Sequence, residues 1–213
     1  MCSSDLVADI PVPRFPLTLE QLDVNPSFLA DLALKAASLN ADSTTASIAE
    51  TLHLGLMISD VLLQRLYEEK LLDRKGMIGL HNHRCALTER GWSRVSQLME
   101  QCSYVGAAPV SLESYTEMIG NQVRSRLPVT KTMLDSVMRD LVLPDNVKRR
   151  LGVVASSGRS LFLSGAPGNG KTAMARALVN AIPGAIWIPY AIEVDGQVIR
   201  VFGKHDHHPV PHA

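Results

Sequence analysis

The residues with the clearest chemical signature form one run, Gly165-Ala166-Pro167-Gly168-Asn169-Gly170-Lys171-Thr172, which fits the phosphate-binding pattern G-x-x-x-x-G-K-[ST]. Glycines allow the backbone of such a loop to curl, so that successive N–H groups point at one phosphate group. Lys171 would then reach the β- and γ-phosphates of a nucleotide, and the hydroxyl of Thr172 would bind Mg²⁺. The pattern predicts that all eight residues contact ATP or ADP, with Thr172 as the metal ligand.

The sequence around this run predicts the elements that must position it. The apolar residues Leu161 to Leu163 are expected to form a buried strand before the loop, and Lys171 to Ala181 a helix after it. That helix would end at Pro183 and Gly184, and Ala185 to Ile188 would form a second buried strand. A glycine-rich loop that binds nothing is the alternative, but the order strand, loop and helix favours phosphate binding.

The residues after the second strand predict a hairpin. Asp195-Gly196 is typical of a tight turn between strands over Tyr190 to Val194 and Gln197 to Phe202. An ATPase also needs an acidic residue at the tip of a later buried strand. Glu193 and Asp195 are the nearest match, but turn chemistry explains them better. We therefore identify no catalytic residue and expect this chain to bind nucleotide without turnover.

Length and composition are those of an ordinary globular protein. The chain has 213 residues, of which 46% are hydrophobic and 20% charged, and these values suit one or two domains. No run is long and apolar enough for a transmembrane helix, and the first residues lack the pattern of a signal peptide. Three scattered cysteines, Cys2, Cys85 and Cys102, give no disulfide framework. These features predict a cytoplasmic protein without membrane contact.

Residues 27–104 predict three helices, a two-stranded hairpin and a fourth helix. The first helix begins near Phe28, the second after an N-cap at Asp42 or Ser43, and the third covers about Met57 to Lys70. One closed set of apolar faces is expected to form the core, from Phe28, Leu32, Ile48, Leu52, Leu62, Leu66, Leu87, Trp92 and Val95. Residues 1–26 contain four prolines and predict an extended or disordered arm.

The hairpin is expected to turn at Arg74-Lys75-Gly76 and to return along Arg84 to Leu87, with Thr88 as the N-cap of the fourth helix. This order of elements, with Ala86-Leu87-Thr88-Glu89-Arg90-Gly91 at the end of the hairpin, resembles a winged helix-turn-helix domain. In such domains the third helix enters the major groove of DNA and the wing touches phosphates.

Charge argues against DNA as the first choice of partner for this domain. Residues 1–104 carry 9 Lys and Arg against 13 Asp and Glu, whereas residues 105–213 carry 12 against 8. The third helix carries Asp60, Glu68 and Glu69, so it would release few counterions from a phosphate backbone. We expect a protein partner, while a basic wing keeps DNA contact as the alternative, through Arg74, Lys75, Arg84 and Arg90.

Two histidine groups suggest metal binding only weakly. His81, His83 and Cys85 alternate along the hairpin, and the remaining group lies near the end of the chain, at His205, His207, His208 and His212. Neither group has a second ligand pair at the spacing of a zinc site. A polar face of the hairpin is the favoured explanation for the first group, and a loop for the second.

Residues 105–142 predict a helical linker, with one helix from about Leu112 and another that begins at Thr130. Residues 143–213 then begin with Leu143-Pro144 and a helix ahead of the phosphate-binding run. This arrangement resembles the N-terminal part of an AAA+ ATPase domain, whose usual loop is Gly-Pro-Pro-Gly-x-Gly-Lys-Thr. The expected fold is therefore a truncated α/β P-loop NTPase of the AAA+ type, preceded by a mainly α winged helix-turn-helix domain.

The resemblance implies several further properties. Leu143 and Pro144 would line the adenine pocket, the whole protein would assemble as a ring homo-oligomer, and ATP hydrolysis would need a longer protein. Ala166 stands where the family has proline, a small change that leaves the backbone cradle intact. Two rival functions stay open: a winged-helix DNA-binding regulator whose loop senses nucleotide, and a small-molecule kinase, which would need a substrate lid and phosphate-clamping arginines.

Overall fold

The computed structural model describes residues 13, 15–124, 129–157, 160–181, 186–203 and 205–207. The chain divides into two compact units, one of residues 12–120 with 187–213 and one of residues 1–11 with 121–186. Each unit is described here by itself. In the described part of the chain no single helix is long and apolar enough to cross a membrane, although α2 and α3 reach that length together as a pair bent by 113°.

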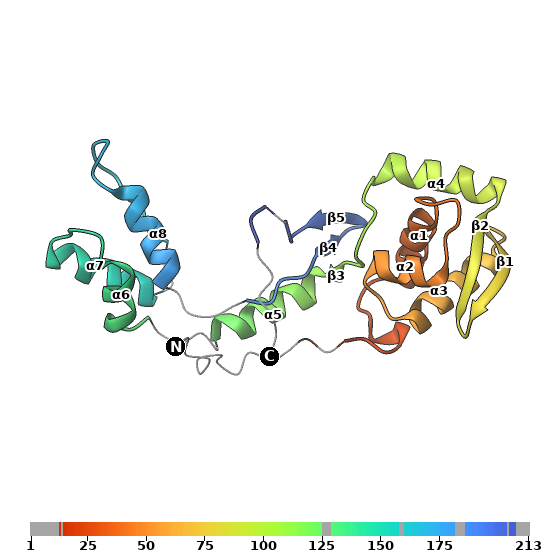
Figure 1. Ribbon diagram of the computed structural model, residues 1–213, viewed down its shortest axis with the longest axis horizontal. Coiled ribbons are helices and arrows are strands. Elements are labelled where there is room, and N and C mark those ends of the chain that lie inside the picture. The colour runs from red at the N-terminus through yellow and green to blue at the C-terminus, as the bar shows by residue number, and fades with distance from the viewer. Residues whose placement is uncertain are drawn as a thin grey trace. The chain divides into compact units, whose positions relative to one another are not determined.

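The larger unit begins with the predicted order of three helices, a hairpin and a fourth helix (Figure 1). After the short 3₁₀ helix η1 (Leu19–Gln21), these elements are α1 (Pro26–Ala37), α2 (Thr45–Leu52), α3 (Leu56–Glu68), β1 (Leu72–Gly79), β2 (Asn82–Leu87) and α4 (Glu89–Gln101). Their apolar faces meet in one core that includes Leu29, Leu32, Leu34, Ile48, Leu52, Ile58, Leu62, Leu63, Leu66 and Leu72.

Side-chain caps explain where the helices start. The Asn25 side chain accepts a hydrogen bond from Ser27 N, and Pro26 occupies the first turn, where a missing N–H costs nothing. Thr88 caps α4 as predicted, with its hydroxyl accepting from Gly91 N at 3.0 Å. The predicted cap of α2 at Asp42 or Ser43 is wrong, because Thr44 is the N-cap and forms a capping box with Ser47.

Two expected core positions lie at the surface instead. Trp92 is 53% exposed and Val61 is 54% exposed. The buried face of α4 contains Gly91, Val95 and Leu98, and Trp92 is rotated away from it by about 100°, one residue along the helix. Gly91 can lie against the core because it has no Cβ: a Cβ at this position would be 2.1 Å from the carbonyl oxygen of Leu71.

The hairpin also turns at a different place from the predicted one. β1 and β2 are antiparallel, with Leu72 opposite Leu87 and Gly79 opposite Asn82, so the turn lies at Leu80 and His81. The Arg74-Lys75-Gly76 segment is part of β1, where the pairing contains an irregularity. Turn chemistry misled the prediction, because His81 takes the positive φ of 58° that a glycine would usually supply.

A second, three-stranded sheet completes the larger unit. β3 (Val110–Ser111) is parallel to β4 (Ala191–Val194), which is antiparallel to β5 (Gln197–Arg200). Asp195 and Gly196 form the predicted tight turn, both with positive φ. This hairpin therefore belongs with residues 12–120, although the sequence suggested that all of residues 143–213 would stay together.

The smaller unit is helical in its described residues (Figure 1). The division between the units falls within α5 (Leu112–Arg124), and α6 (Lys131–Val137), α7 (Asp145–Ser157) and α8 (Lys171–Ala181) follow. Thr130 caps α6, and α8 has the predicted bounds. A small core joins the helices, formed by Leu134, Met138, Leu151, Ala177 and Ala181.

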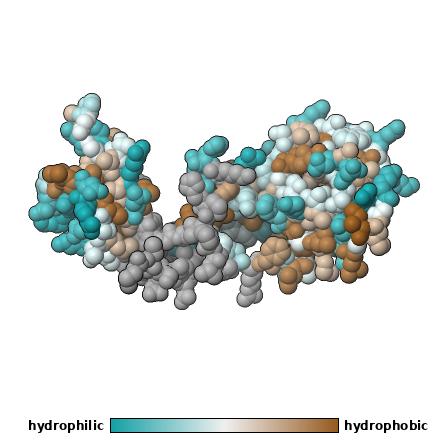
Figure 2. All heavy atoms as spheres, viewed as in Figure 1, coloured by the Kyte–Doolittle hydropathy of each residue, from teal (hydrophilic) through white to brown (hydrophobic). Residues whose placement is uncertain are grey.

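The two buried strands predicted around the phosphate-binding run are absent from the structure. Leu161 to Leu163 and residues 186–188 have no regular secondary structure, Phe162 is 89% exposed, and Ala185 lies outside the described residues, as do Pro183 and Gly184. A parallel strand forms only beside a hydrogen-bonding neighbour. No described segment pairs with Leu161 to Leu163. Hydrophobic residues accordingly reach the surface of this unit as well as that of the larger one (Figure 2).

Candidate nucleotide-phosphate site

The loop before α8 has the backbone conformation that phosphate binding requires. Gly165, Gly168 and Gly170 have φ angles of 148°, 85° and 70°. Residues with a Cβ rarely adopt these angles, so the three glycines are needed at these positions for conformational reasons. A Cβ at Gly168 or Gly170 would meet nothing within 4 Å, which shows that the space beside both residues is open.

Lys171 is the first residue of α8, and its side chain folds back over the loop. The Lys171 ammonium donates hydrogen bonds to the carbonyl oxygens of Gly165 at 2.8 Å and Ala166 at 2.7 Å. An ammonium group has three N–H donors and a flexible four-carbon stem. The positive charge is thus held over the curled backbone, where it could exchange carbonyl oxygens for phosphate oxygens.

The N-terminus of α8 contributes to the same place. The helix begins with the hydrogen bond from Met174 N to Gly170 O at 2.9 Å. The N–H groups before Met174 in the first turn have no carbonyl partner inside the helix, and the helix dipole makes this end positive. Thr172 lies in that turn and is exposed, so its hydroxyl is accessible to a metal ion beside a bound phosphate.

The structure places the other proposed nucleotide contacts less directly. Leu143 packs against the small core around Leu134 and Met138, so it is partly buried. Pro144 precedes α7, where its carbonyl oxygen accepts hydrogen bonds from Val147 N and Lys148 N. These contacts account for both residues locally and leave their expected role at the adenine as a prediction.

The acidic residues considered for Mg²⁺ are engaged in the turn of the second hairpin. Glu193 accepts a hydrogen bond from Gly196 N at 2.6 Å, and Asp195 has a φ of 50°. Both residues lie in the larger unit, whereas the phosphate-binding run lies in the smaller one. Turn chemistry therefore explains both acids, as the sequence suggested.

A buried lysine in the larger unit escaped the sequence analysis. Lys35 is only 4% exposed, and its ammonium donates to the carbonyl oxygens of Cys102 at 3.0 Å and Tyr104 at 2.7 Å. Burial lowers the pKa of Lys35, and nearby Cys102 and Asp31 partly offset that effect. The signal in the sequence is a lysine inside the otherwise apolar run of residues 32–37.

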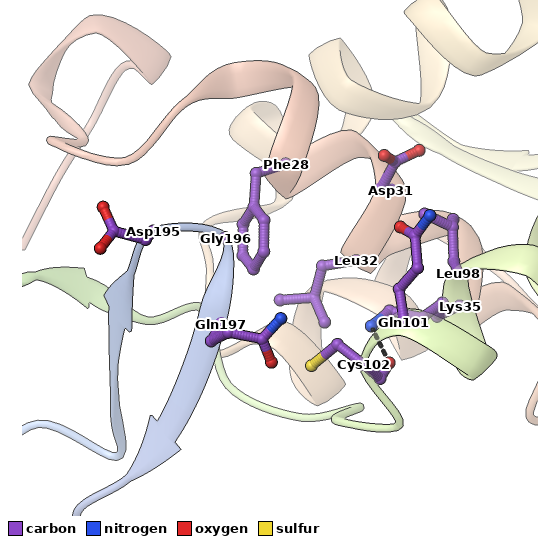
Figure 3. Close-up of a pocket in the computed structure, with 10 residues that line it drawn as sticks. All are labelled: Phe28, Asp31, Leu32, Lys35, Leu98, Gln101, Cys102, Asp195, Gly196 and Gln197. Carbon is purple, nitrogen blue, oxygen red and sulfur yellow. Dashed lines mark hydrogen bonds between the residues drawn. The ribbon is translucent and has the colours of Figure 1, made fainter.

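Lys35 lies at the edge of a pocket of about 340 Å³ between α1, α4 and the turn of the second hairpin (Figure 3). The floor is apolar and the rim polar, and the lining residues are Phe28, Asp31, Leu32, Lys35, Leu98, Gln101, Cys102, Asp195, Gly196 and Gln197. Because the Lys35 ammonium bonds to the chain that follows α4, its clearest role is to tie down the end of that helix.

The histidines of the first hairpin are structural rather than a polar face. His83 and Cys85 are buried, and the Cys85 thiol donates to Ser43 O. His81 Nδ1 is 2.8 Å from Asp60 Oδ2. Among the described residues, no group of three His, Cys, Asp or Glu side chains is arranged to hold a metal ion. Of the later histidines, His207 contacts Gly203, and His208 and His212 lie outside the described residues.

Comparison of the chain with known protein families, with curated proteins and with solved structures finds no match. The geometry of the loop is therefore the basis for a function.

Proposed function

We propose that residues 165–172 bind the phosphates of ATP or ADP together with Mg²⁺. The observation that carries this proposal is the pairing of three positive-φ glycines with a lysine ammonium held over them. An anion is the ligand that such a loop recognises, because N–H dipoles, a helix N-terminus and a fixed cation all present positive charge to one small volume.

In this proposal each group has a separate task. The backbone N–H groups of the loop surround the β-phosphate, Lys171 contacts the β- and γ-phosphates, and the Thr172 hydroxyl contacts Mg²⁺. The fold that fits these tasks is a P-loop NTPase of the AAA+ type, which follows a winged-helix domain. We propose that hydrolysis and ring assembly belong to a longer protein and that the protein acts in the cytoplasm.

The experiment is a calorimetric titration of the chain with Mg²⁺-ATP and Mg²⁺-ADP. Lys171→Ala removes a charge-assisted contact, and such contacts contribute about 1.5 to 3 kcal/mol, or roughly 10- to 150-fold in affinity. Lys131→Ala is the matched control, because Lys131 is also the first residue of a helix in the same unit and is exposed. Equal affinity for wild type and Lys171→Ala would refute the assignment.

A further inference from the structure

The outer surface of α3 combines apolar and acidic side chains. Met57 and Val61 are 64% and 54% exposed and lie four residues apart, so they share one face of the helix. Beside them a shallow hollow of about 650 Å³ runs along α3, lined by Asp60, Val61, Gln64, Arg65, Glu68 and Glu69. Large exposed apolar side chains next to one another, with a polar border, are typical of a binding surface.

The first hairpin extends this surface. Near its turn it exposes Met77 and Leu80, at 76% and 85%. Figure 2 shows hydrophobic residues at the surface of the part of the molecule that holds α3 and this hairpin. We call Met57, Val61, Met77 and Leu80, with the carboxylates of Asp60, Glu68 and Glu69, the α3–hairpin surface.

Specific contacts hold the hairpin beside α3. His81 Nδ1 is 2.8 Å from Asp60 Oδ2 near the turn. Further along β1, Arg74 Nη2 donates to Gln64 Oε1 at 3.1 Å, and its guanidinium lies 4.8 Å from the centre of the Tyr67 ring. The apolar residues of both elements therefore belong to one prearranged surface.

The charges of this surface select the partner. On α3 and its C-cap, three carboxylates face one arginine, and Arg65 is already paired with Glu69 at 2.9 Å. Glu68 accepts a hydrogen bond from the neutral amide of Gln64 at 3.1 Å, which leaves its negative charge in place. A phosphate backbone would be repelled here, whereas lysine or arginine side chains would be attracted.

The basic residues of the hairpin do not reverse this preference. Arg74 is engaged with Gln64 and Tyr67, and Lys75 lies 3.5 Å from the carboxylate of Asp73. Arg84 is exposed on β2. One arginine is a small source of counterion release compared with the several phosphate contacts that DNA-binding domains usually make.

We propose that the α3–hairpin surface binds a basic amphipathic helix of a protein partner. Apolar side chains of that helix pack on Met57 and Val61, and its Lys or Arg residues pair with Glu68 and the neighbouring carboxylates. This is helix recognition by an apolar surface with complementary charge around it. The proposal does not depend on nucleotide binding at residues 165–172, so either one can fail alone.

The test uses the full chain and two fluorescent synthetic helices of about 18 residues, roughly five turns. Both carry leucines along one face; one has lysines on the other face and the matched peptide has glutamates. Anisotropy titrations should show binding of the lysine peptide, weakened by salt, and at least about tenfold weaker binding of the glutamate peptide, a difference of about 1.4 kcal/mol.

Two variants of exposed residues locate the site. Glu68→Lys should weaken the lysine peptide about tenfold and strengthen the glutamate peptide, and Val61→Ser should weaken both. Glu100→Lys on α4 makes the same charge change away from the surface and should alter neither. Circular dichroism confirms that each variant is folded.

Three outcomes overturn the proposal. The first is equal affinity for the two peptides, and the second is an equal effect of Glu68→Lys and Glu100→Lys. The third is salt-dependent binding of a duplex DNA oligonucleotide that Arg84→Ala removes and that exceeds the binding of the lysine peptide, which would assign the surface to nucleic acid.

Discussion

The ammonium of Lys171 lies 2.8 Å from the carbonyl oxygen of Gly165, six residues earlier in the chain. This contact joins the two ends of the phosphate-binding run, because Gly165 opens the loop and Lys171 begins α8. The lysine that would bind phosphate is therefore held across the loop by the loop's own backbone. The predictions below test the loop, its chemistry and the two places where the larger unit is most tightly constrained.

Gly170→Ala should weaken nucleotide binding through the backbone alone. A Cβ at Gly170 has open space, but its φ of 70° costs a residue other than glycine about 1 to 2 kcal/mol. We expect affinity for Mg²⁺-ADP to fall about tenfold in a calorimetric titration. Ser164→Ala alters an exposed side chain just before the loop and should bind normally. Unchanged affinity in Gly170→Ala would mean that the loop does not keep this conformation around a ligand.

The chain should bind ATP without hydrolysing it. Lys171 and Thr172 hold the ground state, whereas turnover needs a group that positions water and stabilises the developing charge. Glu193 and Asp195, the acids closest to such a motif in the sequence, are used in a turn of the other unit. A phosphate-release assay should give the same background for wild type and Lys171→Ala. Turnover of about one per second that disappears in the variant would contradict this prediction.

Gly91→Ala should strongly destabilise the larger unit. The added Cβ would lie 2.1 Å from the carbonyl oxygen of Leu71, so α4 would have to move away from the core. Overpacking of this kind costs about 1 to 3 kcal/mol or more, and thermal unfolding should show a clearly lower midpoint. Gly76→Ala is the control, because a Cβ there meets nothing within 4 Å. Equal stability of the two variants would show that α4 does not pack this closely.

Asp23 should contribute stability that depends on pH. Burial raises the pKa of Asp23, but hydrogen bonds from Ser111 and Ser114 outweigh that effect and lower the pKa below its usual value. The contribution is therefore present above the unfolded pKa of about 3.9 and is lost as the pH falls through the lower folded value.

The measurement is the unfolding midpoint of Asp23→Asn relative to wild type. Asp23→Asn should be less stable at pH 7, and the difference should shrink as the pH is lowered below about 4. Asp42→Asn, at an exposed carboxyl between α1 and α2, should show no such trend. A difference that stays constant down to about pH 2 would mean that the Asp23 charge does not act through this contact.

The local elements were largely predictable from the sequence because local chemistry sets them. Thr88 and Thr130 cap helices as their types suggested, α8 spans the predicted residues, and Asp195-Gly196 forms the predicted turn. The glycines of the phosphate-binding run take the positive φ angles that their spacing implied. Each of these features depends on interactions within a few residues.

Features that depend on distant partners could only be decided by the tertiary structure. Leu161 to Leu163 read as a strand, but a strand needs a neighbour, and no described segment supplies one. Trp92 read as core, but the close approach of Gly91 to Leu71 sets the rotation of α4 and turns Trp92 outward. The sequence by itself determined the loop that can cradle phosphate, whereas tertiary contacts decided that Lys35 is buried and that β4 pairs with β3.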